Sequence, residues 1–292
     1  MILSFHPCYE ADANIICAGR EPDDKDRSAI LAASAVVLPQ GCKESLYRLA
    51  RRHCRHVFPN YDARFNYPGK IGQAKLFHDL NAPHPRTWIF EDSAHFKRCG
   101  DAALVKGFPL VFKLDWGGEG ETVFLLKDRS DLDEALARAR AYEKTGQPGF
   151  IVQRFVPHAN QTLRVVVIGQ TLRSYWRIQD SRSTFGTSLS HGARIDAEAN
   201  PHLRRKTIEN ARRFCRQAHI NLAGLDYIFA MGPHEPEDPP ALLLEINYFF
   251  GRIGLGGSER FYTLLQAEID RWLRERGLTV DRTKYPPSTG KM

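Results

Sequence analysis

Short apolar runs alternate with polar and amphipathic stretches through the first 66 residues. Four of these runs predict short strands, at residues 2–5, 14–18, 35–39 and 56–59. The stretch 43–54 repeats apolar residues at helical spacing and predicts a helix. Strands that alternate with a helix are typical of a small α/β lobe. A segment rich in Tyr, Asn and Pro, NYDARFNYPGK, leads out of this lobe.

The remaining chain becomes mainly antiparallel in character near residue 150. Before that point the pattern predicts a strand at 86–90 and helices at 71–81, 93–100 and 131–142, the last capped by Ser130. After it, apolar runs predict paired strands at 150–156, 162–169, 170–178, 224–230 and 241–247. Amphipathic stretches predict two long helices, at 201–219 and 258–276. Together these elements indicate an α+β protein.

The composition is that of an ordinary globular protein. The 292 residues are 42% apolar and 26% charged, and no apolar run approaches the roughly 18 residues of a membrane span, so no membrane partner is expected. The six cysteines are scattered without a C-x-x-C pair, which favours reduced thiols and a cytoplasmic location. This length suits one large domain or two to three smaller lobes.

The net charge of +7 raises two alternatives, an anionic substrate and a nucleic acid. Basic residues cluster at 204–206 and 212–213, within the predicted helix 201–219. The opposite face of this helix carries apolar residues such as Ala211 and Phe214. A solvated helix face is therefore the favoured interpretation, and a nucleic-acid surface stays open as the alternative.

Residues 108–126, FPLVFKLDWGGEGETVFLL, place a lysine and a glycine cluster between two apolar runs. Lys113 interrupts the first run, and the glycines follow it at Gly117, Gly118 and Gly120. Glycines in a turn can close a plain hairpin, or they can let backbone N–H groups approach phosphates. In the second case Lys113 would supply a fixed counter-charge. This stretch alone leaves both interpretations open.

Three oxygen-bearing side chains gather on the last predicted strand pair. If residues 231–240 form the hairpin loop, Ala230 pairs with Ala241 and Asp226 lies opposite Glu245. Asn247 shares the face of Glu245 because it is two residues further on. Opposed carboxylates repel each other, so they need a cation, and such oxygen ligands suit Mg²⁺. A salt bridge to a nearby arginine is the alternative.

The neighbouring predicted hairpin carries several cations on one face. With Gly169–Gln170 as its turn, the residues on that face are Thr162, Arg164, Arg173, Tyr175 and Arg177. Guanidinium groups stacked in this way indicate a phosphate or carboxylate between them. Simple surface display is the alternative, and it applies most to Arg173.

The order of these features resembles the ATP-grasp superfamily, and most closely the RimK-type and glutathione-synthetase-like carboxylate–amine ligases. The resemblance covers about residues 67–275. It implies two α/β lobes that close over ATP, preceded by a small pre-ATP-grasp α/β domain. The expected organisation is a first lobe at 1–66, an ATP-grasp domain at 67–280 with a lid lobe (86–150) and a metal-binding lobe (151–280), and a disordered tail at 281–292.

The resemblance also implies roles for particular residues. The ATP-binding residues would be Lys70, Lys113, Gly117, Gly118 and Gly120 at the phosphates, and Gln153, Arg154, Phe155 and Val156 at the adenine. The metal ligands would be Asp226, Glu245 and Asn247, and the catalytic arginines Arg164 and Arg177. Two positions depart from the family pattern, because Arg154 replaces a usual Glu and Thr162 a usual acidic residue. These departures leave base and ribose selectivity open.

The resemblance implies ATP-dependent activation of a carboxylate as an acyl phosphate, followed by attack of an amine and release of ADP and phosphate. The implied cofactors are ATP and Mg²⁺, with two ions at the site and Mn²⁺ as a substitute. The expected partners are a small-molecule or peptide carboxylate and an amine, and a homo-oligomer stays open. The alternative is a non-catalytic nucleotide or nucleic-acid binding protein that uses the basic helix.

Overall fold

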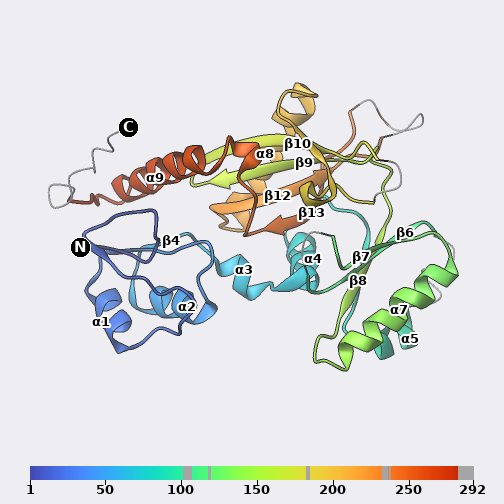
Figure 1. The fold of residues 1–292 in the computed structure, drawn as a ribbon, viewed down its shortest axis with the longest axis horizontal. Helices are drawn as coiled ribbons and strands as arrows, with labels where there is room; N and C mark the ends of the chain where they lie inside the picture. The colour runs from blue at the N-terminus through green and yellow to red at the C-terminus, as the bar shows by residue number, and fades with distance from the viewer. Residues whose placement is uncertain (101–106, 118–119, 182–184, 232–235, 237, 282–292) are drawn as a thin grey trace.

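The computed structural model describes residues 1–100, 107–117, 120–181, 185–231, 236 and 238–281. Three sheets organise these residues and follow one another along the chain (Figure 1). Gly118 and nearly all of the tail expected at 281–292 lie outside the described residues. The α+β fold class expected from the sequence is confirmed, while the domain limits stay predictions.

The first sheet is parallel and has the strand order β2-β1-β3-β4. Its strands are β1 (Ile2–Ser4), β2 (Ala13–Asn14), β3 (Ala35–Val37) and β4 (Val57–Phe58), and its helices are α1 (Asp24–Ala32) and α2 (Glu44–His53). Helix α1 was not expected, because its sequence is mostly polar and it buries only Asp26 and Ile30. A capping box between Asp23 and Asp26 begins it. The predicted strand 14–18 is wrong beyond Asn14.

The second sheet is antiparallel, with the order β5-β8-β6-β7. Its strands are β5 (Thr87–Phe90), β6 (Leu110–Leu114), β7 (Val123–Leu126) and β8 (Phe150–Arg154), and α5 (Ser93–Cys99) and α7 (Arg129–Glu143) pack on it. Phe112 and Phe150 stack at its centre with ring centroids 4.5 Å apart. Helix α7 is capped by Asp128 rather than by Ser130, because the Asp128 carboxylate accepts from the Asp131 amide at 3.1 Å.

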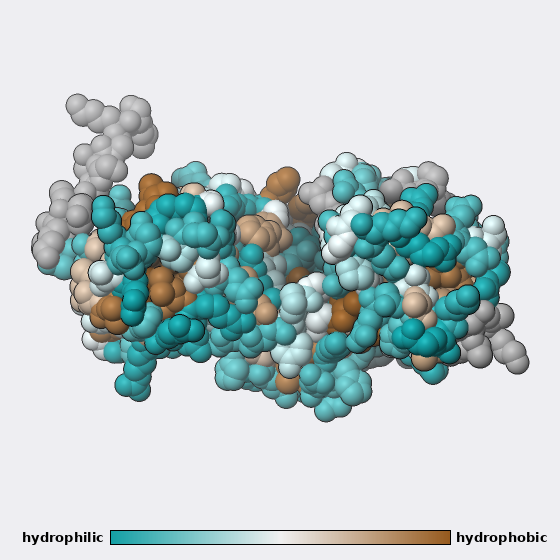
Figure 2. All heavy atoms as spheres, turned by 90° about the horizontal axis from the view of Figure 1, so that it is seen from below, coloured by the Kyte–Doolittle hydropathy of each residue, from teal (hydrophilic) through white to brown (hydrophobic). Residues whose placement is uncertain are grey.

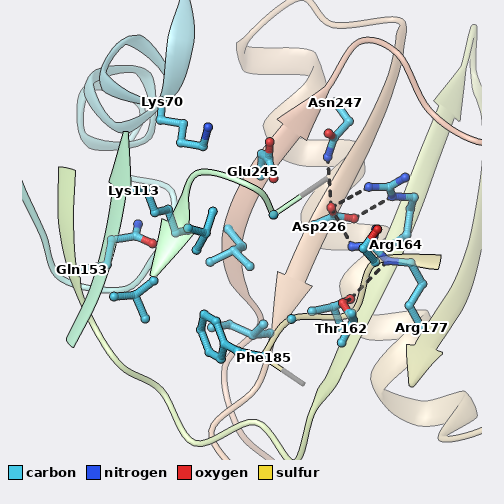
Figure 3. A pocket seen from close by; sticks show the side chains of 18 of the residues that line it. Lys70, Lys113, Gln153, Thr162, Arg164, Arg177, Phe185, Asp226, Glu245 and Asn247 are labelled. Carbon is cyan, nitrogen blue, oxygen red and sulfur yellow. Dashed lines mark hydrogen bonds and ion pairs between the residues drawn. The ribbon is translucent and has the colours of Figure 1, made fainter. Parts of the chain in front are cut away.

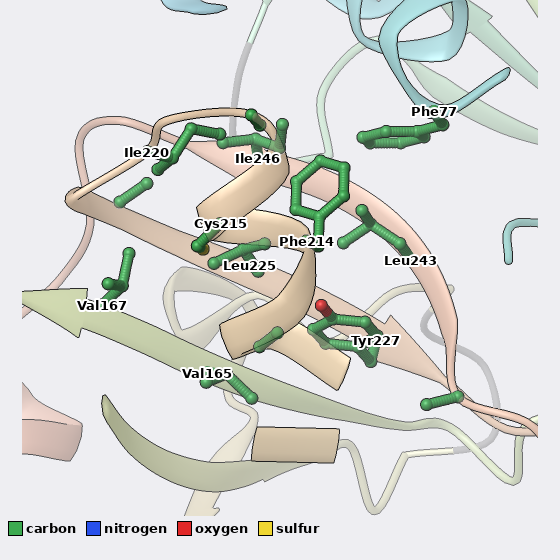
Figure 4. Packing of buried hydrophobic residues seen from close by; sticks show 14 of the residues in the cluster. Phe77, Val165, Val167, Phe214, Cys215, Ile220, Leu225, Tyr227, Leu243 and Ile246 are labelled. Atoms are coloured by element: carbon green, nitrogen blue, oxygen red, sulfur yellow. The ribbon is translucent and has the colours of Figure 1, made fainter. Parts of the chain in front are cut away.

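The third sheet has the order β11-β10-β9-β12-β13 and is antiparallel throughout. Its strands are β9 (Gln161–Ile168), β10 (Thr171–Ile178), β11 (Arg194–Asp196), β12 (Leu222–Ile228) and β13 (Leu242–Asn247). Helix α8 (Pro201–Gln217) covers one face through Phe214 and Cys215 (Figure 4). Helix α9 (Ser258–Arg274) covers the other face. Two short 3₁₀ helices, Leu189–His191 and Ile253–Leu255, lie in the connections.

Two helices join the first sheet to the others. Helix α3 (Asp62–Asn66) lies in the segment expected to be a plain link, and α4 (Gly69–Asp79) follows it. Helix α4 packs between the second and third sheets, where Phe77 meets Phe214 at 5.9 Å between ring centroids. The Gln73 side chain both donates to and accepts from the backbone of Ile246, at 3.0 and 2.8 Å. These bonds fix α4 against β13.

The strand registers expected from the sequence are confirmed where they matter for the site. Asp226 lies opposite Glu245, and Arg164 lies opposite Tyr175. A β-bulge after Asp226 shifts the rest of the β12–β13 pairing by one residue, so Tyr227 lies opposite Leu243. The expected pairing of Ala230 with Ala241 is therefore wrong, although it led to the correct pairing at Asp226.

The surface seen in Figure 2 is mostly hydrophilic, with apolar side chains in scattered patches. Among the described residues, no helix combines the length and the apolar character that crossing a membrane requires. All six cysteines are free thiols, as expected from their spacing.

Candidate active site

A cavity of about 430 Å³ opens between the second and third sheets, beside α4. This volume is in the range of small-molecule sites. Every candidate site residue that the structure describes lines it: Lys70, Lys113, Gly117, Gly120, Gln153, Arg154, Phe155, Val156, Arg164, Arg177, Asp226, Glu245 and Asn247. Residues from four separate parts of the sequence therefore meet at one place.

Lys113 projects into the cavity from the middle of β6 and is only 7% exposed (Figure 3). Burial lowers the pKa of its ammonium group to about 8, while the charge of Glu245 opposes this shift and that of Lys70 adds to it. Within the described part of the chain, the ammonium group of Lys113 donates no hydrogen bond and forms no ion pair. It is a buried cation that lacks a direct partner.

Lys70 lies in the first turn of α4 and contacts the glycine-containing turn between β6 and β7. Its Nζ donates to the carbonyl oxygens of Trp116 and Gly117, both at 3.1 Å. Gly117 has a φ of +86°, and a Cβ there would lie 2.5 Å from Thr122, so both the conformation and the space require glycine. Burial lowers the pKa of Lys70, and the charge of Glu245 opposes that shift.

The end of β8 and the residues that follow it form another wall of the cavity. Gln153 is buried, and its Nε2 donates to Thr87 Oγ1 at 2.9 Å. The Arg154 amide donates to the carbonyl of Arg86 at 2.9 Å, and its Nη1 donates to the carbonyl of Gly107 at 2.7 Å. The Arg154 guanidinium is thus held at the cavity edge by the backbone that precedes β6.

The third sheet presents a buried ion-pair network across the cavity. Arg164 donates to both oxygens of Asp226 through Nε and Nη2, each at 2.7 Å. Arg177 Nη2 lies 2.8 Å from Asp226 Oδ2, and its Nε donates to Thr162 Oγ1 at 3.3 Å. Asn247 Nδ2 donates to the same Asp226 oxygen at 3.0 Å (Figure 3). The salt bridge left open as an alternative for Asp226 is therefore present.

The ion pairs of this network favour the ionised forms of Asp226 and Arg164. Burial alone would raise the pKa of Asp226, but Arg164 and Arg177 outweigh it and lower the pKa to about 2. Burial would lower the pKa of Arg164, and Asp226 in turn raises it. Bidentate geometry of this kind also fixes the orientation of the guanidinium plane.

Glu245 stands apart from this network, between the lysines and Asp226 (Figure 3). Within the described residues its carboxylate has no hydrogen bond and no ion pair, and the amide oxygen of Asn247 is also unbonded there. Among those residues, no group of three or more His, Cys, Asp or Glu side chains could hold a metal ion. Glu245 and Asn247 fit a Mg²⁺ ion that completes its shell with phosphate oxygens and water.

Several cavity residues were not expected from the sequence. Gln73, Thr122 and Thr187 line the cavity and act by bonding backbone or a neighbouring side chain. The contacts of Gln73 and Thr187 are long-range in the sequence, so no local pattern indicates them, whereas Thr122 bonds Trp116 only 6 residues away. Arg173 is exposed and does not line the cavity, in line with the surface alternative for that residue.

The three-sheet arrangement and the lysine-bearing second sheet that faces a carboxylate-bearing third sheet define an ATP-grasp fold. A family profile described as "RimK-like ATP-grasp domain" matches residues 75–253, and the chain belongs to this family. The resemblance expected from the sequence is thereby confirmed. A comparison with curated proteins found no match.

Solved structures show the same fold at low identity. A RimK domain ATP-grasp protein from Sphaerobacter thermophilus DSM 20745 has a TM-score of 0.58 at 15% identity, over 91% of this chain and 98% of that one. D-alanine–D-alanine ligase from Bacillus anthracis has a TM-score of 0.61 at 12% identity, over 91% and 86%. An ADP complex of N5-carboxyaminoimidazole ribonucleotide synthetase has a TM-score of 0.56 at 13% identity. That match covers 81% of this chain but only 59% of the synthetase.

Proposed function

We propose that the chain is an ATP- and Mg²⁺-dependent ligase that joins a carboxylate to an amine and releases ADP and phosphate. The observation that carries this proposal is the pair formed by the buried Lys113 and the half-buried Lys70, which face Glu245 across one cavity. Buried cations without a direct counter-ion favour an anionic ligand, and the phosphates of ATP have the required charge. The family match and the nucleotide-bound relative support the same conclusion.

In the first step, a carboxylate oxygen of the acid would attack the γ-phosphorus of ATP. The bond from that phosphorus to the ADP oxygen breaks, and an acyl phosphate forms. Lys70 and Lys113 would hold the phosphates, and backbone amides at Gly117, Gly118 and Gly120 would close over them. Gln153, Arg154, Phe155 and Val156 would border the adenine, and Arg154 and Thr162 would bear on base and ribose selectivity.

In the second step, the amine nitrogen would attack the acyl carbon. A C–N bond forms, phosphate leaves with the electrons of the C–O bond, and the amine proton passes to the departing phosphate. Arg164 and Arg177 suit the binding of the reacting anions, because each keeps N–H donors that Asp226 does not use. The pairing with Asp226 would hold these donors in position before the substrate arrives.

The metal would be held by Glu245 and Asn247, with Asp226 beside them. When bound, Mg²⁺ would neutralise phosphate charge as it develops. Two ions, or Mn²⁺ in place of Mg²⁺, stay part of the proposal. A direct bond from Asp226 would have to compete with Arg164 and Arg177, so we assign the primary carboxylate role to Glu245.

The test is an ADP-release assay with Mg²⁺·ATP and a panel of amino acids and short peptides, each offered alone and in pairs. The proposal expects release that depends on both an acid and an amine, and that is lost without Mg²⁺. Binding of ATP without ADP release for any pair would favour a non-catalytic nucleotide-binding protein. Salt-sensitive binding of RNA or DNA without ATP would favour the nucleic-acid alternative.

The free thiols support a cytoplasmic location as part of this proposal.

A further inference from the structure

A second cavity lies at the far end of the third sheet from the candidate active site, beside the β9–β10 turn. Its volume is about 620 Å³, and no residue that the structure describes lines both cavities. Its walls come from the C-terminal ends of α2, α8 and α9 and from the turn at Gly169 and Gln170. It is therefore a separate feature of the molecule, and a ligand could bind there whether or not the chain is a ligase.

Positive charges converge on this second cavity, and none of the described residues that line it is an acid. The lining cations are Arg51, Arg55, Arg212, Arg216 and Arg276, accompanied by His56 and His219. Helices α2 and α8 end here, and the negative end of each helix dipole favours basic residues. That effect explains part of the clustering, but it offsets only about half a charge per helix.

Carboxylates around the rim compensate only part of the positive charge. Asp62 pairs with Arg51 at 2.9 Å, Glu275 lies 3.8 Å from Arg276, and Glu209 lies 4.0 Å from Arg212. In the described part of the chain, Arg55 and Arg216 form no ion pair and donate no side-chain hydrogen bond. Two guanidinium groups therefore lack a described carboxylate partner even if each rim pair is counted as neutral.

The excess charge acts on the groups within the cavity. Burial and the charges of Arg276 and Arg55 together lower the pKa of His56. Trp272 adds an aromatic wall to the cavity. The Arg276 guanidinium carbon lies 4.3 Å from its ring centroid, and the His56 ring meets its edge with the two ring centroids 6.5 Å apart. A cationic floor beside a flat aromatic wall suits a ligand that combines anionic and organic groups.

We propose that this second cavity binds a ligand with two or more phosphate groups. Each phosphate offers about two negative charges and three acceptor oxygens, which match the donor geometry of arginine. The lining arginines come from the C-terminal ends of three helices and line one cavity, which favours a compact ligand over an extended nucleic-acid backbone. Elsewhere on α8, Arg204 bonds Ser174 and Lys206 pairs with Asp238, so the helix presents no continuous row of free cations.

Calorimetric titration of inorganic pyrophosphate into the full chain, at fixed ionic strength, tests the proposal. The double variant Arg55→Ala/Arg216→Ala removes the two guanidinium groups that lack a described carboxylate partner. The matched control Arg52→Ala/Arg213→Ala removes two exposed arginines from the same two segments, and neither lines the cavity. We expect the control to bind as the wild type does, and the first variant to bind at least about tenfold more weakly.

Both double variants leave the candidate active site unchanged, so any pyrophosphate bound there contributes equally to the two titrations. ADP titrated in parallel separates an organic phosphate ester from an inorganic one. Equal pyrophosphate affinity in the two variants would overturn the proposal. So would an oligonucleotide of about 12 nucleotides that binds more tightly than pyrophosphate and loses affinity equally in both variants.

Melting curves of the ligand-free proteins show whether a loss of pyrophosphate binding comes from a destabilised fold. Removing Arg55 and Arg216 breaks no described contact and relieves repulsion, so the melting temperature should stay the same or rise. If the alanine variant melts lower, Arg55→Gln/Arg216→Gln keeps the side-chain length and the apolar stems, and it must then show the same loss of pyrophosphate binding. Retained binding in the glutamine variant would contradict the proposal.

Discussion

The two walls of the candidate active site carry charge in opposite ways. On one wall, Lys70 and Lys113 are cations that no carboxylate of the described residues contacts directly, and burial lowers the pKa of both. On the other, Arg164, Asp226 and Arg177 form a closed ion-pair network with distances of 2.7–2.8 Å. We call these the lysine wall and the ion-pair wall.

The two walls differ in whether their charged groups have a partner among the described residues. The two arginines of the ion-pair wall already share a carboxylate without a ligand, so removing that carboxylate should cost stability, and the pairing should hold the remaining donors in one orientation. The lysine wall keeps its charge at the cost of desolvation, and only an anion relieves that cost. Substitutions on the two walls should therefore have opposite effects on stability and on ligand binding.

The largest expected effect is loss of stability on breaking the ion-pair wall. Asp226→Asn leaves Arg164 and Arg177 buried without a counter-charge and should lower the free energy of unfolding by about 3–5 kcal/mol. Asp180→Asn is the matched control, because it removes an exposed pair with Arg194 at 3.0 Å and should cost at most about 1 kcal/mol. Urea unfolding of both variants measures the difference, and similar small losses would show that the network does not stabilise the fold.

The next largest effect concerns the carboxylate between the walls. Glu245→Gln keeps the shape of the side chain but removes the charge that the proposed metal needs, so Mg²⁺-dependent ADP formation should fall by more than about a hundredfold. The free energy of unfolding should stay within about 1 kcal/mol of wild type, because Glu245 has no described ion pair. Glu259→Gln, on the exposed side of α9, is the control. Retained activity with a large loss of stability would contradict the metal role.

A smaller effect should appear in the pH dependence of ATP binding. The pKa of Lys113 is about 8 in the free protein, and bound phosphates would raise it. Below pH 8 the lysine is charged and ready to bind, whereas above pH 8 binding must take up a proton. ATP affinity should therefore fall by up to about tenfold per pH unit above 8. Lys113→Arg stays charged throughout and should flatten this profile in fluorescence or calorimetric titrations, whereas an unchanged slope would remove Lys113 from the phosphate site.

Much of this site could be predicted from the sequence because its information is local. The two-residue turn Gly169–Gln170 fixed the register that puts Arg164 opposite Tyr175. The pairing of Asp226 with Glu245 was predicted separately, from an assumed hairpin loop at 231–240, and it is correct although Ala230 does not pair with Ala241. Lys113 was recognisable because a lysine inside an apolar strand conflicts with its surroundings.

The rest depends on contacts that no local pattern encodes. The bond between Gln73 and the Ile246 backbone joins segments 173 residues apart, and nothing near Gln73 indicates it. The sequence raised a salt bridge for Asp226 without selecting Arg164 and Arg177, because that choice follows from the packing of three strands. Helices α1 and α3 were missed for a simpler reason, since both are short and begin in polar segments.

The central claim is that the lysine wall binds the phosphates of ATP, and thermal melting with and without Mg²⁺·ATP tests it most directly. A ligand present at a hundred times its Kd stabilises the native state by about 2.7 kcal/mol, so the wild type should melt at a clearly higher temperature with ATP. Lys113→Met should lose most of that gain while the free variant melts no lower than wild type. Lys75→Met, on the exposed side of α4, should keep the full gain. A Lys113→Met variant that gains as much from Mg²⁺·ATP as the wild type would contradict the claim.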